Sequence, residues 1–461
     1  MFQRSPTPSR QGGAVAIMVA ISMVVLLGAV GLVVDAGLAY LVKARLNAAV
    51  DSAALAGARA VTDGSTQAAQ IASAQAAAAT FFAANIPTSY MFSKPKLLST
   101  NVTFNGGRAT IDVTAEAPLP VSFMQVLGFT SLKPVAYAQT VRNDLDMALV
   151  VDTSGSLKSS ASVVQASAKS FLNKFNASQD RVALIHFAGG AEVDNAMSST
   201  RGFNRASMNT NIDAFQFGNG TNSSEGFWHA RNQLNSIPSG SRSVMRVIVF
   251  FSDGVPTSFS SSFTFNPGYY CTKVGAIDNS PPTNLGGYSG LFPINDSNGA
   301  PMAGCEATRV EKYTYYGYTY QQQAVSNIKR MPDTYNAHPD SVTYPLLTDT
   351  PRQVTTTDLT NLTVGAINIG RVARNLPEAM AAQSRAEGIY VFTLGLGSDL
   401  KKTIDGEVGE DFLKCMANVP DAPSRCYKPN QPVGMYCYAA TEADLTPCFS
   451  RLATAILRIT K

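Results

Sequence analysis

The chain has 461 residues, of which 45% are hydrophobic and 15% are charged, and its formal net charge is +4. This composition is typical of folded rather than disordered chains, and the length predicts two or three folded units. The charge is too small for this length to indicate binding to nucleic acid, so we expect no nucleic-acid partner.

An uncharged apolar segment covers residues 14–34. As a helix, these roughly 21 residues reach about 32 Å, which is enough to cross the hydrocarbon core of a bilayer. Arg4 and Arg10 precede the segment without an acidic residue, which predicts that the N-terminus stays in the cytoplasm. A cleaved signal peptide is the alternative, but its apolar core would be shorter, about 7–15 residues. We therefore expect one retained membrane helix.

Residues 35–60 are rich in alanine and leucine, which favour helix, so we expect the membrane helix to continue to about residue 60. This N-terminal block resembles the TadE/TadG-like pilus assembly family. The matching residues are Gln11 to Ala16, Val34 to Gly37 with Tyr40, and Ala48 to Ala58. The resemblance implies a bacterial Tad/Flp-type pilus system. It places the chain in the inner membrane as a single-pass protein whose bulk is periplasmic or extracellular.

A small α+β stalk domain is expected over residues 61–143. An alanine-rich helix is predicted for residues 67–84, ahead of Pro87. Candidate strands follow at residues 97–104, 109–115 and 132–142. Asn105-Gly106-Gly107 predicts a hairpin turn between the first two strands. This region carries no catalytic constellation, so we interpret it as a spacer, with a docking surface as the alternative.

The remaining residues, 144–461, begin with a strand that ends in oxygen-bearing side chains. Residues 147–151 are apolar and partly β-branched, which predicts a buried strand of a parallel sheet. Asp152 ends this strand, and Ser154 and Ser156 follow at alternate positions. Ligands of open α/β sheets bind just outside the carboxyl ends of the strands. The three oxygen side chains therefore predict part of a site for a hard cation.

The rest of this site is expected downstream. A turn rich in glycine and asparagine presents Thr221, and a second apolar strand over residues 247–251 is followed by Asp253. These motifs resemble the von Willebrand factor A domain and its metal-ion-dependent adhesion site. The resemblance implies an α/β fold with a doubly wound, mostly parallel sheet. It also assigns the metal ligands, which are Asp152, Ser154, Ser156, Thr221 and Asp253.

All five predicted ligands offer oxygen, which suits Mg²⁺, with Mn²⁺ or Ca²⁺ as alternatives. In the family the hydroxyls bind the ion directly while the aspartates act largely through water, so a carboxylate of a protein partner completes the coordination. The alternative interpretation is that Ser154 and Ser156 merely cap the next helix. Pilins of the Tad class carry a glutamate near the start of the apolar stretch. This chain has none there, which indicates the TadG-like branch, in which such an anchor precedes a von Willebrand A domain.

An insertion without strong periodicity is expected over about residues 256–362. It contains a tyrosine-rich run, residues 313–320, and we expect it to flank the metal site and to influence the choice of partner. A poorly ordered surface segment is the alternative. All six cysteines lie in the second half of the chain, which predicts disulfides between Cys271 and Cys305 and locally among Cys415, Cys426, Cys437 and Cys448. His186 is interpreted as a packed core residue.

Together these patterns predict a membrane-anchored, metal-dependent adhesion or scaffold protein of a Tad/Flp-type pilus system. Its partners would be components of the pilus or secretion machinery. The alternative is a structural stalk or envelope-anchoring protein whose metal site does not function. The sequence contains no Gly-x-Ser-x-Gly elbow, His-Glu-x-x-His helix or Walker loop, so we do not expect an enzyme.

Overall fold

The computed structural model describes residues 12–61, 67–105, 108–280 and 286–459. The chain forms two compact units, Met1–Arg142 and Asn143–Lys461.

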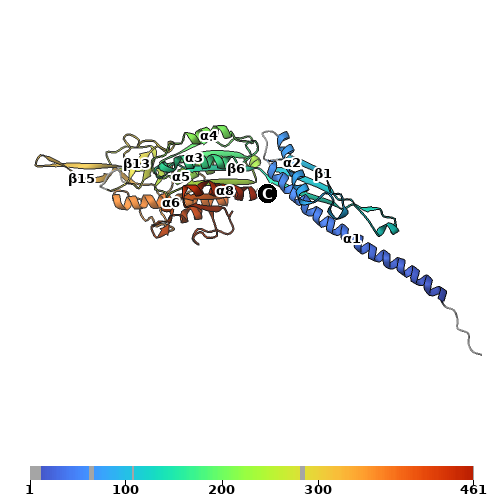
Figure 1. The fold of residues 1–461 in the computed structure, drawn as a ribbon. Helices are drawn as coiled ribbons and strands as arrows, with labels where there is room; N and C mark the ends of the chain where they lie inside the picture. The colour runs from blue at the N-terminus through green and yellow to red at the C-terminus, as the bar shows by residue number, and fades with distance from the viewer. Residues whose placement is uncertain (1–11, 62–66, 106–107, 281–285, 460–461) are drawn as a thin grey trace, which may run out of the picture. The chain divides into compact units, whose positions relative to one another are not determined.

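The first unit is built on one long helix, α1 (Gly12–Ala60), which confirms the predicted continuous helix (Figure 1). Of the described helices, α1 alone is long and apolar enough to cross a membrane. Its apolar side chains are mostly exposed over residues 15–34, whereas Val42, Leu46 and Val50 are fully buried. The first part thus offers an apolar surface that lipid could cover, and the second part belongs to a folded core. Arg4 and Arg10 lie outside the described residues, so the orientation stays a prediction.

The second half of α1 packs against α2 (Gln67–Asn85) and a sheet in the order β1–β2–β5. The three strands are β1 (Lys96–Asn105), β2 (Arg108–Glu116) and β5 (Val135–Asn143). Small residues allow the close packing, because a side chain at Gly57 would meet Ile111 and the Ala74 carbonyl at 3.1 and 3.3 Å. Gly106 and Gly107 of the expected hairpin turn lie outside the described residues, although Asn105 pairs with Arg108 across the strands.

The second unit contains a six-stranded sheet that confirms the predicted doubly wound, mostly parallel fold. Its order is β20 (Met435–Ala439), β17 (Tyr390–Leu396), β9 (Met245–Ser252), β6 (Leu145–Asp152), β7 (Arg181–Phe187) and β8 (Ala191–Asn195). Only β8, at the edge, runs antiparallel to its neighbour. Parallel strands buried on both faces read as continuous apolar runs, which is why β6 and β9 were recognisable in the sequence.

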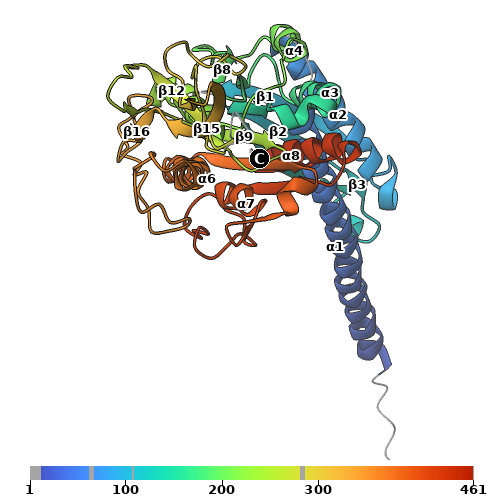
Figure 2. The ribbon, with the colours of Figure 1, turned by 90° about the vertical axis from the view of Figure 1, so that its left-hand side faces the viewer.

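Helices cover both faces of this sheet. Leu149 and Val151 share one core with α3 (Ala161–Leu172), α4 (Arg205–Asp213) and α8 (Leu445–Ile459). Val150 points to the other core, with α5 (Ser223–Ser236), α6 (Leu362–Ala386) and α7 (Asp411–Ala417). Figure 2 shows α6 and α7 together on one side of the sheet.

The connections reverse direction at β6. From β6 the chain proceeds to β7 and β8 on one side, and it then returns to form β9 and β17 on the other side. β6 and β9 are therefore the neighbouring strands at the topological switch point, where open α/β sheets bind ligands.

The insertion is more regular than the sequence pattern indicated. It contains a three-stranded sheet, a long hairpin and a short strand pair. These strands are β10 (Ser258–Ser262), β12 (Val274–Asp278) and β13 (Ser289–Phe292), then β14 (Thr308–Tyr315) and β15 (Tyr318–Ser326), and finally β11 (Thr264–Phe265) with β16 (Ile328–Arg330). Phe259, Ile277 and Leu291 are fully buried in the core shared with α5 and α6. The insertion is therefore part of the folded domain.

Three disulfides link the six cysteines, as predicted: Cys271–Cys305, Cys415–Cys426 and Cys437–Cys448. The first closes a loop within the insertion. The third joins the edge strand β20 to helix α8.

Replacing Cys437 and Cys448 together with serine should lower the free energy of unfolding by about 3 kcal/mol, because the bridge closes a loop with a sequence separation of 11. The same change at Cys271 and Cys305, separated by 34, should cost about 4 kcal/mol. Guanidinium unfolding of the purified chain measures both values, and peptide mapping without reductant checks the pairing. An unchanged unfolding midpoint in either double variant would contradict this prediction.

Candidate functional site

The candidate site lies where β6 and β9 end side by side. Asp152, the last residue of β6, is fully buried. Its carboxylate accepts hydrogen bonds from the Ser154 backbone N–H at 2.8 Å and from the Ser252 hydroxyl at 2.6 Å. A buried carboxylate needs such donors to offset the loss of water. Both strand ends therefore hold Asp152 in one position.

The two predicted serines continue the site toward Asp253. The hydroxyl oxygens of Ser154 and Ser156 lie 3.2 Å apart, and the Ser156 hydroxyl donates to Asp253 Oδ1 at 2.9 Å. Ser154 stands at the start of the short helix η3 (Gly155–Ser160), but its hydroxyl makes no capping hydrogen bond there. The capping interpretation therefore does not account for Ser154. Four of the five predicted residues form one continuous set of contacts.

Thr221 lies in a neighbouring loop that the backbone ties to the first one. The Gly155 N–H donates to the Asn219 carbonyl at 3.1 Å, and the Gly218 N–H donates to the Thr153 carbonyl at 3.0 Å. Thr221 itself is buried just before helix α5. Its backbone N–H donates to the Thr257 hydroxyl at 3.0 Å. These backbone contacts fix Thr221 beside the Asp152 loop.

The electrostatics of the site favour a cation. Burial raises the pKa of Asp152 to about 6, although hydrogen bonds from Ser154 and Ser252 oppose the shift. Burial and repulsion by Asp152 raise the pKa of Asp253 to about 7. Two neighbouring carboxylates that resist ionisation would be stabilised as anions by a positive charge between them.

The donor set and its spacing fit Mg²⁺. An octahedral ion with bonds of about 2.05 Å has neighbouring ligand atoms about 2.9 Å apart. The hydroxyl oxygens of Ser154 and Ser156, two of the proposed direct ligands, lie 3.2 Å apart, which is close to that spacing. The donors are hydroxyl and carboxylate oxygens, the ligands preferred by hard cations.

Sequence reasoning missed three residues that support the site. Ser252, which holds Asp152, directly precedes Asp253 and could have been found from that position. Thr257 accepts from the Thr221 N–H and donates to Asp278 Oδ2 at 2.7 Å. Asp278 leaves no room for a side chain at Gly220, because a Cβ there would lie 2.0 Å from its carboxylate. Asp278 belongs to the insertion, and no local pattern connects it with Thr221.

His186 is buried in β7 as expected, but it belongs to a polar network. Its Nδ1 lies 2.8 Å from Asp194, and its Nε2 lies 2.9 Å from the Ser297 hydroxyl. This order of hydroxyl, imidazole and carboxylate is that of a hydrolase triad. Ser297, however, is only 1% exposed, and its hydroxyl also lies within hydrogen-bond distance of Glu192, at 3.0 Å. The network therefore fastens the insertion to β7 and β8.

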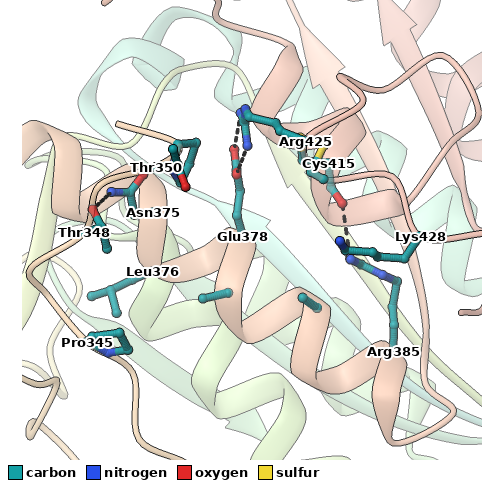
Figure 3. A pocket seen from close by; sticks show the side chains of 14 residues that line it. Pro345, Thr348, Thr350, Asn375, Leu376, Glu378, Arg385, Cys415, Arg425 and Lys428 are labelled. Carbon is teal, nitrogen blue, oxygen red and sulfur yellow. Dashed lines mark hydrogen bonds and ion pairs between the residues drawn. A yellow bond between two sulfur atoms is a disulfide. The ribbon is translucent and has the colours of Figure 1, made fainter. Parts of the chain in front are cut away.

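A cavity of about 360 Å³ lies elsewhere in the second unit, between α6 and the segments around residues 345–351 and 415–428 (Figure 3). Several of its polar groups already have protein partners. Glu378 pairs with Arg425 at 2.7 Å, and Arg385 donates to the Cys415 carbonyl at 3.1 Å. Asn375 donates to the Thr348 hydroxyl at 3.0 Å. With Glu378, Arg425 and Arg385 engaged by protein groups, this cavity is a weaker candidate than the strand-end site.

Two family models match parts of the chain. Residues 146–265 match the von Willebrand factor type A domain, and residues 13–60 match the family described as putative Flp pilus-assembly TadE/G-like. No curated protein matches the chain.

Similar solved structures include the pilus adhesin SpaC of Lactobacillus rhamnosus GG in its open conformation, at 15% identity and a TM-score of 0.37. The match covers 80% of this chain but 34% of SpaC, so the chain spans about a third of that adhesin. The vWF domain of the type V pili tip protein Mfa5 of Porphyromonas gingivalis matches at 18% identity and a TM-score of 0.36, covering 70% of this chain and 98% of that one. A von Willebrand factor type A structure from Catenulispora acidiphila matches at 10% identity and a TM-score of 0.33, covering 79% and 50%.

The two sequence matches confirm both resemblances that the motifs indicated: this chain joins a TadE/G-like N-terminal segment to a von Willebrand factor type A domain.

Proposed function

We propose that the chain is a membrane-anchored, metal-dependent adhesion or scaffold protein of a bacterial Tad/Flp-type pilus assembly system. The observation that carries this proposal is the run of oxygen contacts from Ser154 through Ser156 to Asp253 where β6 and β9 end. The hydroxyls of Ser154, Ser156 and Thr221 would bind Mg²⁺ directly, with Asp152 and Asp253 acting through water. When bound, the ion supplies an electron-poor position that accepts a carboxylate from a protein partner.

The N-terminal segment supports the cellular setting. Residues 13–60 match a pilus-assembly family, and α1 presents an exposed apolar surface over residues 15–34. In this proposal α1 holds the chain in the inner membrane with its N-terminus in the cytoplasm. The second unit then meets its partner, a component of the pilus or secretion machinery, outside that membrane.

The insertion supports a role in choosing the partner. Its first strands are tied to the Thr221 loop through Thr257 and Asp278. Its hairpin, β14 with β15, projects from the rest of the second unit (Figure 1). Tyr316 and Tyr318 at the hairpin tip are 84% and 70% exposed. Tyrosine gives a large amphipathic contact area at a low entropic cost, which suits protein recognition.

Replacing Ser156 with alanine should weaken Mg²⁺ binding by at least about tenfold, or about 1.4 kcal/mol, because this hydroxyl contacts both Ser154 and Asp253. Isothermal titration calorimetry measures the affinity. Ser160→Ala is the matched control, since the Ser160 hydroxyl lies on the same short helix but donates to Glu442. Equal affinities in the two variants would remove Ser156 from the site.

Replacing Asp253 with alanine should abolish Mg²⁺-dependent capture of the partner from solubilised membranes while the circular dichroism spectrum stays unchanged. Asp253 follows the last residue of β9, and its partly buried carboxylate accepts a hydrogen bond from the Ser156 hydroxyl. The sheet should therefore form without this side chain. The pull-down is run in Mg²⁺ and in EDTA. Capture that persists in EDTA at full strength would favour the alternative of a structural stalk with a non-functional metal site.

Changing Tyr316 and Tyr318 together to alanine should reduce partner capture at least about fivefold and leave Mg²⁺ affinity unchanged, because both side chains are exposed on the hairpin. This double variant is preferable to deletion of the whole insertion, because a deletion would also remove the buried residues Phe259 and Leu291 from the core. Tyr270→Ala, another exposed tyrosine of the insertion outside the hairpin, is the control. If all three tyrosines prove equally dispensable, the hairpin is not the recognition surface.

A further inference from the structure

A second cluster of metal-ligating side chains lies on α5, separate from the strand-end site. Glu225 and His229 are one helical turn apart on this helix, and His338 reaches them from the insertion segment that follows β16. Their ligating atoms all lie within 4.8 Å of one another. The chain has only three histidines, so two of the three meet at one carboxylate.

Glu225 is the centre of this cluster. Its side chain is 0% exposed, its Oε1 contacts His338 Nε2, and His229 Nε2 lies 3.8 Å away. Glu225 Oε2 and His229 Nε2 are both buried and make no hydrogen bond to the described part of the chain. A buried polar atom without a partner costs about 1–3 kcal/mol, and a charged one costs more. The cluster therefore contains two buried polar atoms whose missing partners cost free energy, and a shared cation would interact with both.

An ion pair between Glu225 and a protonated His338 explains the cluster only in part. It accounts for Oε1 and leaves Oε2 and His229 Nε2 without partners. A second protonated imidazole would face the first, since the rings of His229 and His338 are 5.3 Å apart.

We propose that Glu225, His229 and His338 bind a zinc-type transition-metal ion. Two imidazole nitrogens and one carboxylate are a ligand set of tetrahedral zinc, whose ligand atoms lie about 3.3 Å apart at bonds of about 2.0 Å. Reaching that spacing from the present cluster requires His229 to approach Glu225 from 3.8 Å and the close contact between Glu225 and His338 to lengthen. The remaining position suits water or the hydroxyl of nearby Tyr335, which is also buried without a hydrogen-bond partner in the described residues.

The ion would join the insertion to the sheet domain. Glu225 and His229 belong to α5, which packs against β6 and β7, while His338 belongs to the insertion. The two proposed sites differ in chemistry, since imidazole selects zinc-type ions and the all-oxygen strand-end site suits Mg²⁺. This inference does not depend on the proposed function.

The chain carries a natural reporter of this site. Trp228 is its only tryptophan, and the indole stacks on the His338 ring with centroids 3.9 Å apart. An ion on His338 would therefore lie close enough to change the indole fluorescence, and Co²⁺ would quench it.

The test uses the full chain in detergent, stripped with EDTA and returned to excess Mg²⁺. Excess Zn²⁺ is then added and dialysed away, and one Zn²⁺ per chain should remain, as measured by inductively coupled plasma mass spectrometry. Co²⁺ should quench Trp228 and develop the visible absorption bands of a tetrahedral site, and Zn²⁺ should reverse both signals.

His229→Gln keeps the stack of Trp228 on His338 and should weaken Zn²⁺ binding at least tenfold; Glu225→Gln provides the same test if the first variant folds poorly. His186→Gln, the same change at the histidine outside the cluster, should retain the zinc. Ser156→Ala should retain it as well, which separates this site from the strand-end site. The proposal is overturned if the native chain retains no zinc, or if His229→Gln and Glu225→Gln bind zinc as tightly as the native chain.

Discussion

The arrangement of the candidate site in the second unit depends on the carboxylate of Asp152, which is buried at the end of strand β6. Helices cover both faces of β6, so its last residue, Asp152, lies out of contact with water. A charge in that position is costly unless donors reach it, and donors reach it from the ends of the two strands at the switch point. Ser154 and Ser252 provide them from the ends of β6 and β9. The hydrogen bonds to the Asp152 carboxylate thus bring together two segments that are 100 residues apart in the sequence.

The insertion also holds the loops of the candidate metal site in place. It begins directly after the Asp253 loop, and the Thr257 N–H donates to the Thr221 carbonyl at 3.1 Å. The Asn219 amide donates to the Ser297 carbonyl at 3.3 Å, which adds a second contact from a later segment of the insertion. The loops of the candidate metal site are therefore held in place both by the strands of the sheet and by hydrogen bonds to the insertion. Substitutions in the insertion could consequently alter the site without touching a ligand.

Features that depend on neighbouring residues could be predicted from the sequence, whereas features that depend on residues far apart in the chain could not. The buried strands β6 and β9, the long helix α1 and the pairing of nearby cysteines follow from local patterns. The oxygen residues of the site were found because each follows a recognisable strand or turn. Strand β10 was not predictable, because it reads Ser258-Phe-Ser-Ser-Ser262 and the partners of two of its buried serines are distant in the sequence. Ser260 accepts from Asn222 at 2.9 Å, and Ser261 donates to Asn336 at 2.7 Å. The spacing of Glu225 and His229 is a local signal, but His338 is 113 residues from Glu225 and only the fold unites them.

Helix α5 links the two clusters through its first turn. Asn222, next to Thr221, accepts from the Glu225 backbone N–H at 3.2 Å and donates to the Ser260 hydroxyl at 2.9 Å. The backbone of Glu225 is thus fixed to the Thr221 loop, while its carboxylate faces His338 of the insertion. A displacement of His338 cannot be absorbed by Glu225 alone, because the residue is fully buried and anchored at both ends. Tightening the histidine cluster would therefore restrain the start of α5, and with it the loop that presents Thr221 to the strand-end site.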